Sequence, residues 1–268
     1  MKRLFLYLPL LLLTAYRPAF AVELSDFVFA NYLGSGLYSA AGRDVGVLAI
    51  PFSAPEPVYQ RDNLQVMVNI PVTFGFFNFS TGSPLPPGIP ERLDTLTVVP
   101  SVNFEYQMNN SWKLTPFVDL GFGKNFSDGS NVGIYATGIR SNLDFQLAGR
   151  KARLGNRLLY AAYSPGDNVL TSFDTGVEVT RPLKGTLFGK KLNASLYVVN
   201  FLYLQNLQFV SYASGVPSAN VAMQNEIGIT FGLGRGIGRP TLKIPRIGIG
   251  YRVGGDVSAV RIVFGAPF

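Results

Sequence analysis

The residues that could carry chemistry in this chain are carboxylates, lysines and arginines, because it contains no His and no Cys. Without His it lacks the most common general base and metal ligand, and without Cys it lacks thiol nucleophiles, disulfides and Cys–zinc sites. Acids and bases recur on the polar face of predicted strands: Glu105, Lys113, Asp119, Asp174, Glu178, Glu226, Arg246, Arg252 and Arg261. Such residues could hydrolyse a substrate as a carboxylate pair, select solutes, or neutralise one another. We predict an interior salt-bridge network, with Glu226, Arg246, Arg252 and Arg261 on three successive late strands.

Two glycine-rich stretches could be mistaken for phosphate loops. Residues 232–239 lack G-x-G-x-x-G spacing and precede no predicted helix, and residues 185–190 are one residue short of a P-loop. Both are predicted to be turns. We therefore expect no catalytic residue, no cofactor and no metal, although a Ser–Lys or paired-carboxylate enzyme remains an alternative.

The first 21 residues have the order of a secretory signal peptide. Lys2 and Arg3 precede an apolar run over residues 4–13, and Ala19-Phe20-Ala21 supplies a small-residue cleavage site. The run is too short for a membrane-spanning helix, which needs about 20 residues. We predict cleavage after Ala21 and a mature domain over residues 22–268. Removing the three basic residues of this segment leaves 20 basic and 16 acidic residues, scattered along the chain, which argues against nucleic-acid binding.

The mature chain alternates with a period of two residues, the pattern of strands with one apolar and one polar face. Every even position from Leu64 to Phe76 is apolar, and the pattern returns over residues 95–107 and 112–122. The Asn109-Asn110-Ser111 turn makes the last two runs a hairpin.

A soluble β-sandwich and a membrane β-barrel share this pattern. Runs of about 11–13 residues fit membrane-crossing strands better than soluble strands of about 5–6. The export signal and the low charged fraction of 15% agree. We predict an all-β fold, a closed antiparallel transmembrane β-barrel.

Eleven strands can be placed: 44–53, 63–79, 93–107, 111–123, 131–147, 156–164, 168–181, 192–208, 220–233, 241–254 and 258–268. Bacterial single-chain barrels close with an even number of strands. We therefore predict 12, with ten as the alternative, and place the missing strand within residues 131–164, where the alternation slips. Pro71, Pro100 and Pro116 predict bulges or strand ends, because Pro cannot donate to a ladder.

The two ends of the mature chain carry further predictions. Leu24, Phe27, Val28 and Tyr32 have helical spacing, which predicts a short N-terminal helix, located in the lumen. Val260, Ile262, Phe264, Ala266 and Phe268 alternate down to the terminal aromatic. A final strand that ends in an aromatic resembles the signal by which outer-membrane proteins are recognised for insertion, so Phe268, Phe264 and Ile262 are predicted to form it.

Residues 27–36, 247–254 and 260–268 resemble the solitary outer-membrane autotransporter-type β-barrel family. The resemblance spans the mature chain and implies a 12-stranded barrel, similar to an autotransporter translocator without a passenger. It supplies no catalytic motif. Outer-membrane lipases, acyltransferases and proteases resemble one another in relying on a His, which this chain lacks.

Three classes of function follow for an outer-membrane location in a Gram-negative cell. The first is a structural or interaction barrel with a filled lumen, the second a channel for small solutes, and the third an enzyme, which we do not expect. Twelve strands lie between filled 8-stranded barrels and open 16–18-stranded porins. The expected partners are outer-membrane lipid and the barrel-assembly machinery, and nucleic acid is not expected.

Overall fold

The computed structural model describes residues 31–40, 43–77, 93–126, 128–165, 169–187, 189–210, 217–239, 242–255 and 257–268. The predicted signal peptide over residues 1–21 and its cleavage site lie outside the described residues. So do Leu24, Phe27 and Val28 of the segment predicted to be helical.

The described residues form a chain of strands joined mostly by short turns. The strands are β1 (Gly36–Ala40), β2 (Arg43–Ser53), β3 (Tyr59–Arg61), β4 (Leu64–Phe77), β5 (Leu93–Val98), β6 (Ser101–Gln107), β7 (Trp112–Asn125), β8 (Asn131–Leu147), β9 (Arg150–Ser164), β10 (Val169–Leu187), β11 (Lys190–Val210), β12 (Pro217–Arg239), β13 (Leu242–Gly254) and β14 (Val257–Phe264). Residues 31–33, before β1, are helical.

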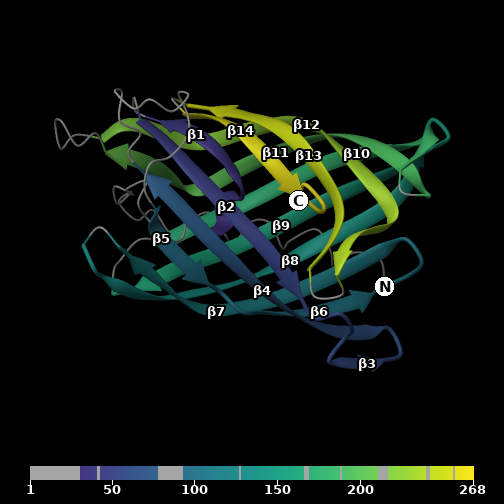
Figure 1. Cartoon of the computed structure of the whole chain (residues 1–268), viewed down its shortest axis with the longest axis horizontal. Helices are drawn as coiled ribbons and strands as arrows, with labels where there is room; N and C mark the ends of the chain where they lie inside the picture. The colour runs from purple at the N-terminus through teal and green to yellow at the C-terminus, as the bar shows by residue number, and fades with distance from the viewer. Residues whose placement is uncertain are drawn as a thin grey trace, which may run out of the picture.

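The strands close into an antiparallel barrel (Figure 1). Neighbours follow chain order from β7 to β14, β14 pairs with β1, and β1 pairs with β2, which in turn pairs with β4. Within the described part of the chain, 14 strand segments fill 12 positions in the wall, because β2 with β3 and β5 with β6 follow one another along β4. The predicted closed barrel of 12 strands is confirmed, and the alternative of ten is wrong.

The break between β5 and β6 lies at Val99 and Pro100, the second of which was predicted to disturb a strand. The Val99 amide donates to the Pro71 carbonyl at 3.2 Å, and the Leu120 amide donates to the Pro100 carbonyl at 2.9 Å. Pro71 and Pro116 instead stand inside β4 and β7. Only Pro100 therefore marks a strand end.

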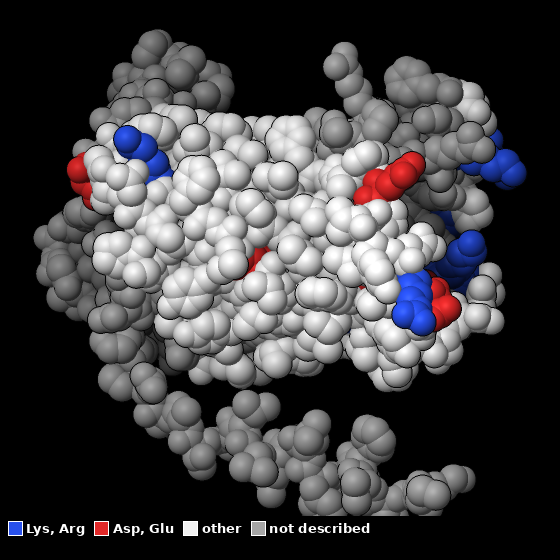
Figure 2. Space-filling view, turned by 90° about the horizontal axis from the view of Figure 1, so that it is seen from below, with Lys and Arg blue, Asp and Glu red and all other residues white. Residues whose placement is uncertain are grey.

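The outer surface of the barrel is apolar. Exposed large hydrophobic residues occur on strand after strand, among them Val102, Phe104, Val118, Leu120, Phe122, Tyr135, Ile139, Leu158, Phe173, Val177, Leu196, Val198, Ile227, Ile249, Tyr251, Val260 and Ile262. On the face in Figure 2, charged side chains gather at the two ends and leave a broad uncharged band, apart from one small acidic patch. This surface is suited to lipid. Among the described residues, no helix has the length and hydropathy needed to cross a membrane.

The strand missing from the sequence-based count is β1, and its predicted place within residues 131–164 was wrong. That region holds two full strands, β8 and β9, joined at Ala148 and Gly149. β1 has only five residues and contains Gly36 and Ser39, so it shows too little alternation to be recognised. It nevertheless closes the barrel, since it lies between β14 and β2.

The predicted final strand over residues 258–268 is too long. β14 ends at Phe264, and Gly265 has a φ of +87°, a left-handed conformation that glycine adopts readily. Its amide donates to the Arg246 carbonyl at 3.0 Å, which turns the chain away from the wall. Ile262 faces outward, but Phe268 packs with the interior hydrophobic cluster, so Phe268 does not continue the outward face.

Leu120 tests the assignment of the outer face. Its side chain is 64% exposed on β7, so Leu120→Arg places a charge in lipid and should lower the free energy of unfolding by about 2–4 kcal/mol near the midplane. Asn69→Arg, on a lumen-facing position of β4, should lower it much less. Urea titrations of both variants in lipid vesicles give the comparison, and equal losses would show that the facing is wrong.

Candidate functional site

The interior of the barrel is the candidate site, because the strand register turns acids and bases into it. Asp119 pairs in register with Ser101 and Ala136, and Glu226 with Arg252 and Val199. Continuing these inward positions around the wall places every predicted lumen residue on the inner face: Glu105, Lys113, Asp119, Asp174, Glu178, Glu226, Arg246, Arg252 and Arg261.

The most deeply buried group is the Glu226 cluster, formed by Tyr197, Glu226, Arg252 and Arg261. The Tyr197 hydroxyl donates to Glu226 Oε1 at 2.7 Å. Arg252 Nε and Arg261 Nη1 donate to Oε2 at 2.8 and 2.9 Å. The side chains of Glu226 and Arg252 are 0% and 2% exposed. One carboxylate therefore faces two guanidinium groups, with a neutral phenol on its other oxygen.

Small and aromatic neighbours make room for this cluster. Gly228 and Gly250 face each other across β12 and β13, and a Cβ on either glycine would collide with the Tyr197 hydroxyl. The Arg252 guanidinium lies 3.7 Å from the centre of the Phe201 ring, a cation–π contact that stabilises charge away from water. The glycine pair and the ring explain how large polar side chains fit inside the wall.

A second group of charges lies farther around the wall, on β7, β8, β9 and β10. Arg157 Nε donates to Asp174 Oδ2 at 2.6 Å, joining β9 to β10. Arg140 Nη1 donates to Asn103 Oδ1 at 2.7 Å, and its guanidinium lies 4.1 Å from the centre of the Phe117 ring. Asp174 and Asp119 are each buried.

The segment before β1 reaches across the lumen to this second group. The Tyr32 hydroxyl donates to Asp119 Oδ2 at 3.0 Å, and Thr97 donates to Asn31 Oδ1 at 2.8 Å. Burial raises the pKa of Tyr32, so its hydroxyl keeps the proton that it donates. Tyr32 also packs against the interior hydrophobic cluster together with buried Leu33. The helical residues 31–33 therefore lie in the lumen, as predicted for this segment.

A third set of ion pairs lies toward the barrel end formed by the short turns. Glu178 on β10 pairs with Arg246 on β13. Lys113 Nζ lies 2.7 Å from Glu105 Oε2, with both side chains partly exposed, and Arg153 Nε lies 2.6 Å from Asp144 Oδ1. Arg246 was expected beside Glu226, but it stands in register with Gly232, farther along β12. It pairs with Glu178 instead.

The C-terminal tail also enters the interior. Phe268 lies against Gly155 of β9 and Gly176 of β10, which pair directly with each other. A Cβ on Gly176 would lie 2.7 Å from Phe268 Cδ1, and a Cβ on Gly155 would overlap Phe268 Cδ2 and Cε2. Only glycine at these two positions leaves space for the ring, so we call them the glycine socket.

Sequence reasoning missed several residues of these groups. Arg140, Arg153 and Arg157 lie on β8 and β9, where the alternation seemed to slip, so their inward direction was not assigned. Tyr197 and Phe117 were missed because only acids and bases were predicted to line the interior. A register assigned to both strands would have placed Arg140 directly opposite Arg157. Two arginines that face each other on neighbouring strands are the signal that could have revealed their inward direction.

The charged side chains of the interior neutralise one another. Every carboxylate described above has a lysine, an arginine or a tyrosine hydroxyl as its partner. Among the residues described by the structure, no group of three His, Cys, Asp or Glu side chains could hold a metal ion. The expectations of no enzyme activity, no cofactor and no metal stay predictions.

Glu226→Gln tests how strongly the interior depends on its buried cluster. The change leaves Arg252 buried without its counter-ion, and removing one member of a buried pair costs about 3–5 kcal/mol of unfolding free energy. Glu105→Gln is the control, because its pair with Lys113 is partly exposed and is expected to contribute less than about 1 kcal/mol. Urea unfolding in vesicles measures both; a small loss for Glu226→Gln would contradict the assignment.

Comparison with known proteins shows likeness of fold at low sequence identity. No family model and no curated protein matches the chain. Among solved structures, it is similar to LpxR from Salmonella typhimurium, with 11% identity and a TM-score of 0.46 over 89% of this chain and 94% of that chain. It is also similar to the beta domain of the Bordetella autotransporter BrkA, with 11% identity and a TM-score of 0.45 over 87% of this chain and 96% of that chain. An autotransporter β domain is thus among the solved structures that the chain resembles.

Proposed function

We propose that the protein is an outer-membrane β-barrel with an occluded lumen, which acts as a structural or interaction protein and not as a diffusion channel. The apolar outer surface and the antiparallel closure support insertion into a bilayer. The predicted signal peptide over residues 1–21 supports export, and the outer membrane is the membrane that such barrels occupy.

The observation that carries the proposal is the position of the C-terminal tail. It leaves the wall at the end of β14 and places Phe268 on the glycine socket of β9 and β10. In the sheet order, β13, β12 and β11 lie between β14 and β10. The tail therefore runs from one side of the barrel toward the other and occupies space that a solute would need.

Two further contacts narrow the interior. The segment before β1 reaches Asp119 on β7 through Tyr32, and Arg246 on β13 reaches Glu178 on β10. Apolar side chains also fill the lumen, because Phe117, Leu159 and Val199 are inward and almost fully buried. A water-filled pore would instead have a polar, hydrated lining.

We further propose that the barrel-assembly machinery recognises the C-terminal residues Phe268, Phe264 and Ile262 before the barrel has folded. The inward position of Phe268 in the folded barrel is compatible with this role, because recognition precedes closure. Outer-membrane lipid is the second proposed partner, through the apolar outer surface.

Planar-bilayer recording tests the occluded lumen against the alternative of a small-solute channel. The mature barrel is refolded in detergent and inserted at protein concentrations at which a general porin gives clear conductance steps. It should show no steady conductance, because its own chain blocks the lumen. A variant that lacks residues 266–268 should show more frequent openings, since its glycine socket is empty. Refolding in detergent is essential, because that variant also lacks the proposed insertion signal.

Regular conductance steps from the unaltered barrel would contradict the proposal and favour the channel. Heat-modifiable mobility of both proteins on gels serves as the control that each has folded and is present in the bilayer.

A further inference from the structure

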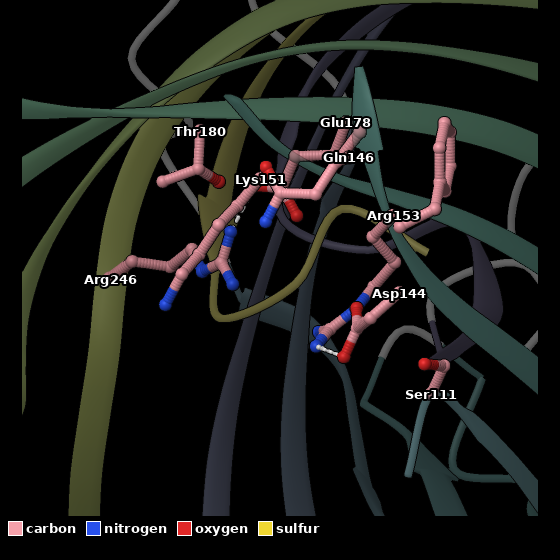
Figure 3. A pocket seen from close by; sticks show the side chains of 10 residues that line it. Ser111, Asp144, Gln146, Lys151, Arg153, Glu178, Thr180 and Arg246 are labelled. Carbon is pink, nitrogen blue, oxygen red and sulfur yellow. Dashed lines mark hydrogen bonds and ion pairs between the residues drawn. The ribbon is translucent and has the colours of Figure 1, made fainter. Parts of the chain in front are cut away.

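We propose that a recess at the turn end of the lumen, here called the turn-end pocket, binds a phosphate group carried by a small polyol. The pocket has a volume of about 440 Å³ and is lined by residues of β8, β9, β10 and β13 (Figure 3). Its charged and hydroxyl-bearing members are Asp144, Lys151, Arg153, Glu178, Thr180 and Arg246. This inference goes beyond the proposed function, because an occluded barrel needs no ligand.

The charges of the turn-end pocket do not cancel. Arg153 and Asp144 form a two-point pair, with Nε to Oδ1 at 2.6 Å and Nη2 to Oδ2 at 3.0 Å, and Arg246 pairs with Glu178. Lys151 lines the same pocket and forms no salt bridge with a described residue. The three cations therefore face two carboxylates, which leaves one positive charge for a ligand to neutralise.

The surplus charge lies beside Arg246. The register of β9 and β10 places Lys151 opposite Thr180 and Arg153 opposite Glu178, so Lys151 and Glu178 lie on neighbouring positions of the inner wall. In Figure 3, Lys151 and Arg246 occupy one side of the pocket and the Arg153–Asp144 pair the other. An ammonium and a guanidinium close to each other in a partly enclosed space favour a bound anion.

The nature of the cations favours phosphate. A guanidinium offers a planar set of donors that matches phosphate oxygens, and an ammonium binds phosphate as a compact point charge. The Thr180 hydroxyl and the Gln146 amide add neutral donors and acceptors to the wall. The two carboxylates, which would repel a bare dianion, can accept hydrogen bonds from the hydroxyls of a polyol.

The pocket has room for a small phosphorylated group. Ligand pockets are typically about 300–1,000 Å³, so this pocket is large enough for a glycerol phosphate or a group of similar size. Such a group exists as a free solute and as the head of a phospholipid. Both sources present the same chemistry to Lys151 and Arg246.

Calorimetric titration of the refolded mature barrel tests the site with two probes. The probes are glycerol 3-phosphate and dihexanoyl phosphatidylglycerol below its micelle concentration. We expect saturable binding that weakens about tenfold in Lys151→Gln, because a charge-assisted contact is lost. Saturation by glycerol 3-phosphate assigns a free solute, and saturation by the lipid alone assigns a headgroup.

Lys184→Gln is the matched control. Lys184 is an exposed lysine near the end of β10 and does not line the pocket. Its replacement by Gln removes the same charge from the protein but leaves the pocket unchanged. Binding should be unchanged in this variant. The proposal is overturned if neither probe saturates, or if the two variants weaken binding equally. Heat-modifiable mobility establishes that both variants are folded.

Discussion

The interior of this barrel depends on the ion pairs that the buried carboxylate of Glu226 forms with two arginines. It lies on β12 and binds Arg252 of β13 and Arg261 of β14, so it ties three neighbouring strands together inside the wall. Arg261 stands in register with Gly36 of β1, at the seam where the barrel closes. A charge buried without its counter-ion is strongly unfavourable, so this arrangement specifies which strands meet at the seam as well as holding them.

The same physical constraint shapes the rest of the lumen. Twelve strands enclose more space than side chains of the wall alone fill easily, and the chain fills it with arginines, aromatic rings and its own ends. Each large group needs space against the wall, and glycine supplies it. Gly228 and Gly250, on the two strands that follow β11, accommodate the side chain of Tyr197, while Gly155 and Gly176 accommodate Phe268. These inward-facing glycines therefore provide space for interior packing.

The sequence was sufficient for the architecture because alternation is a local property that repeats on almost every strand. It correctly indicated an all-β barrel of 12 strands and the outward direction of residues such as Leu120 and Ile262. It failed where the outcome depends on contacts between distant residues. β1 is too short for periodicity to reveal, and the bend at Gly265 interrupts an alternation that continues in the sequence to Phe268. The pairing of Arg246 with Glu178 depends on barrel curvature, which periodicity does not encode.

The central claim is that the chain closes its own lumen with its C-terminal residue, and proton–proton contacts measure this most directly. In a deuterated barrel with protonated Phe rings and glycines, nuclear Overhauser spectra should connect the Phe268 ring with the α protons of Gly155 and Gly176. The same cross-peaks should vanish in Phe268→Leu, which identifies the ring among the 21 phenylalanines of the chain. Resonances of Phe268 at random-coil positions, with no contact to either glycine, would contradict the account.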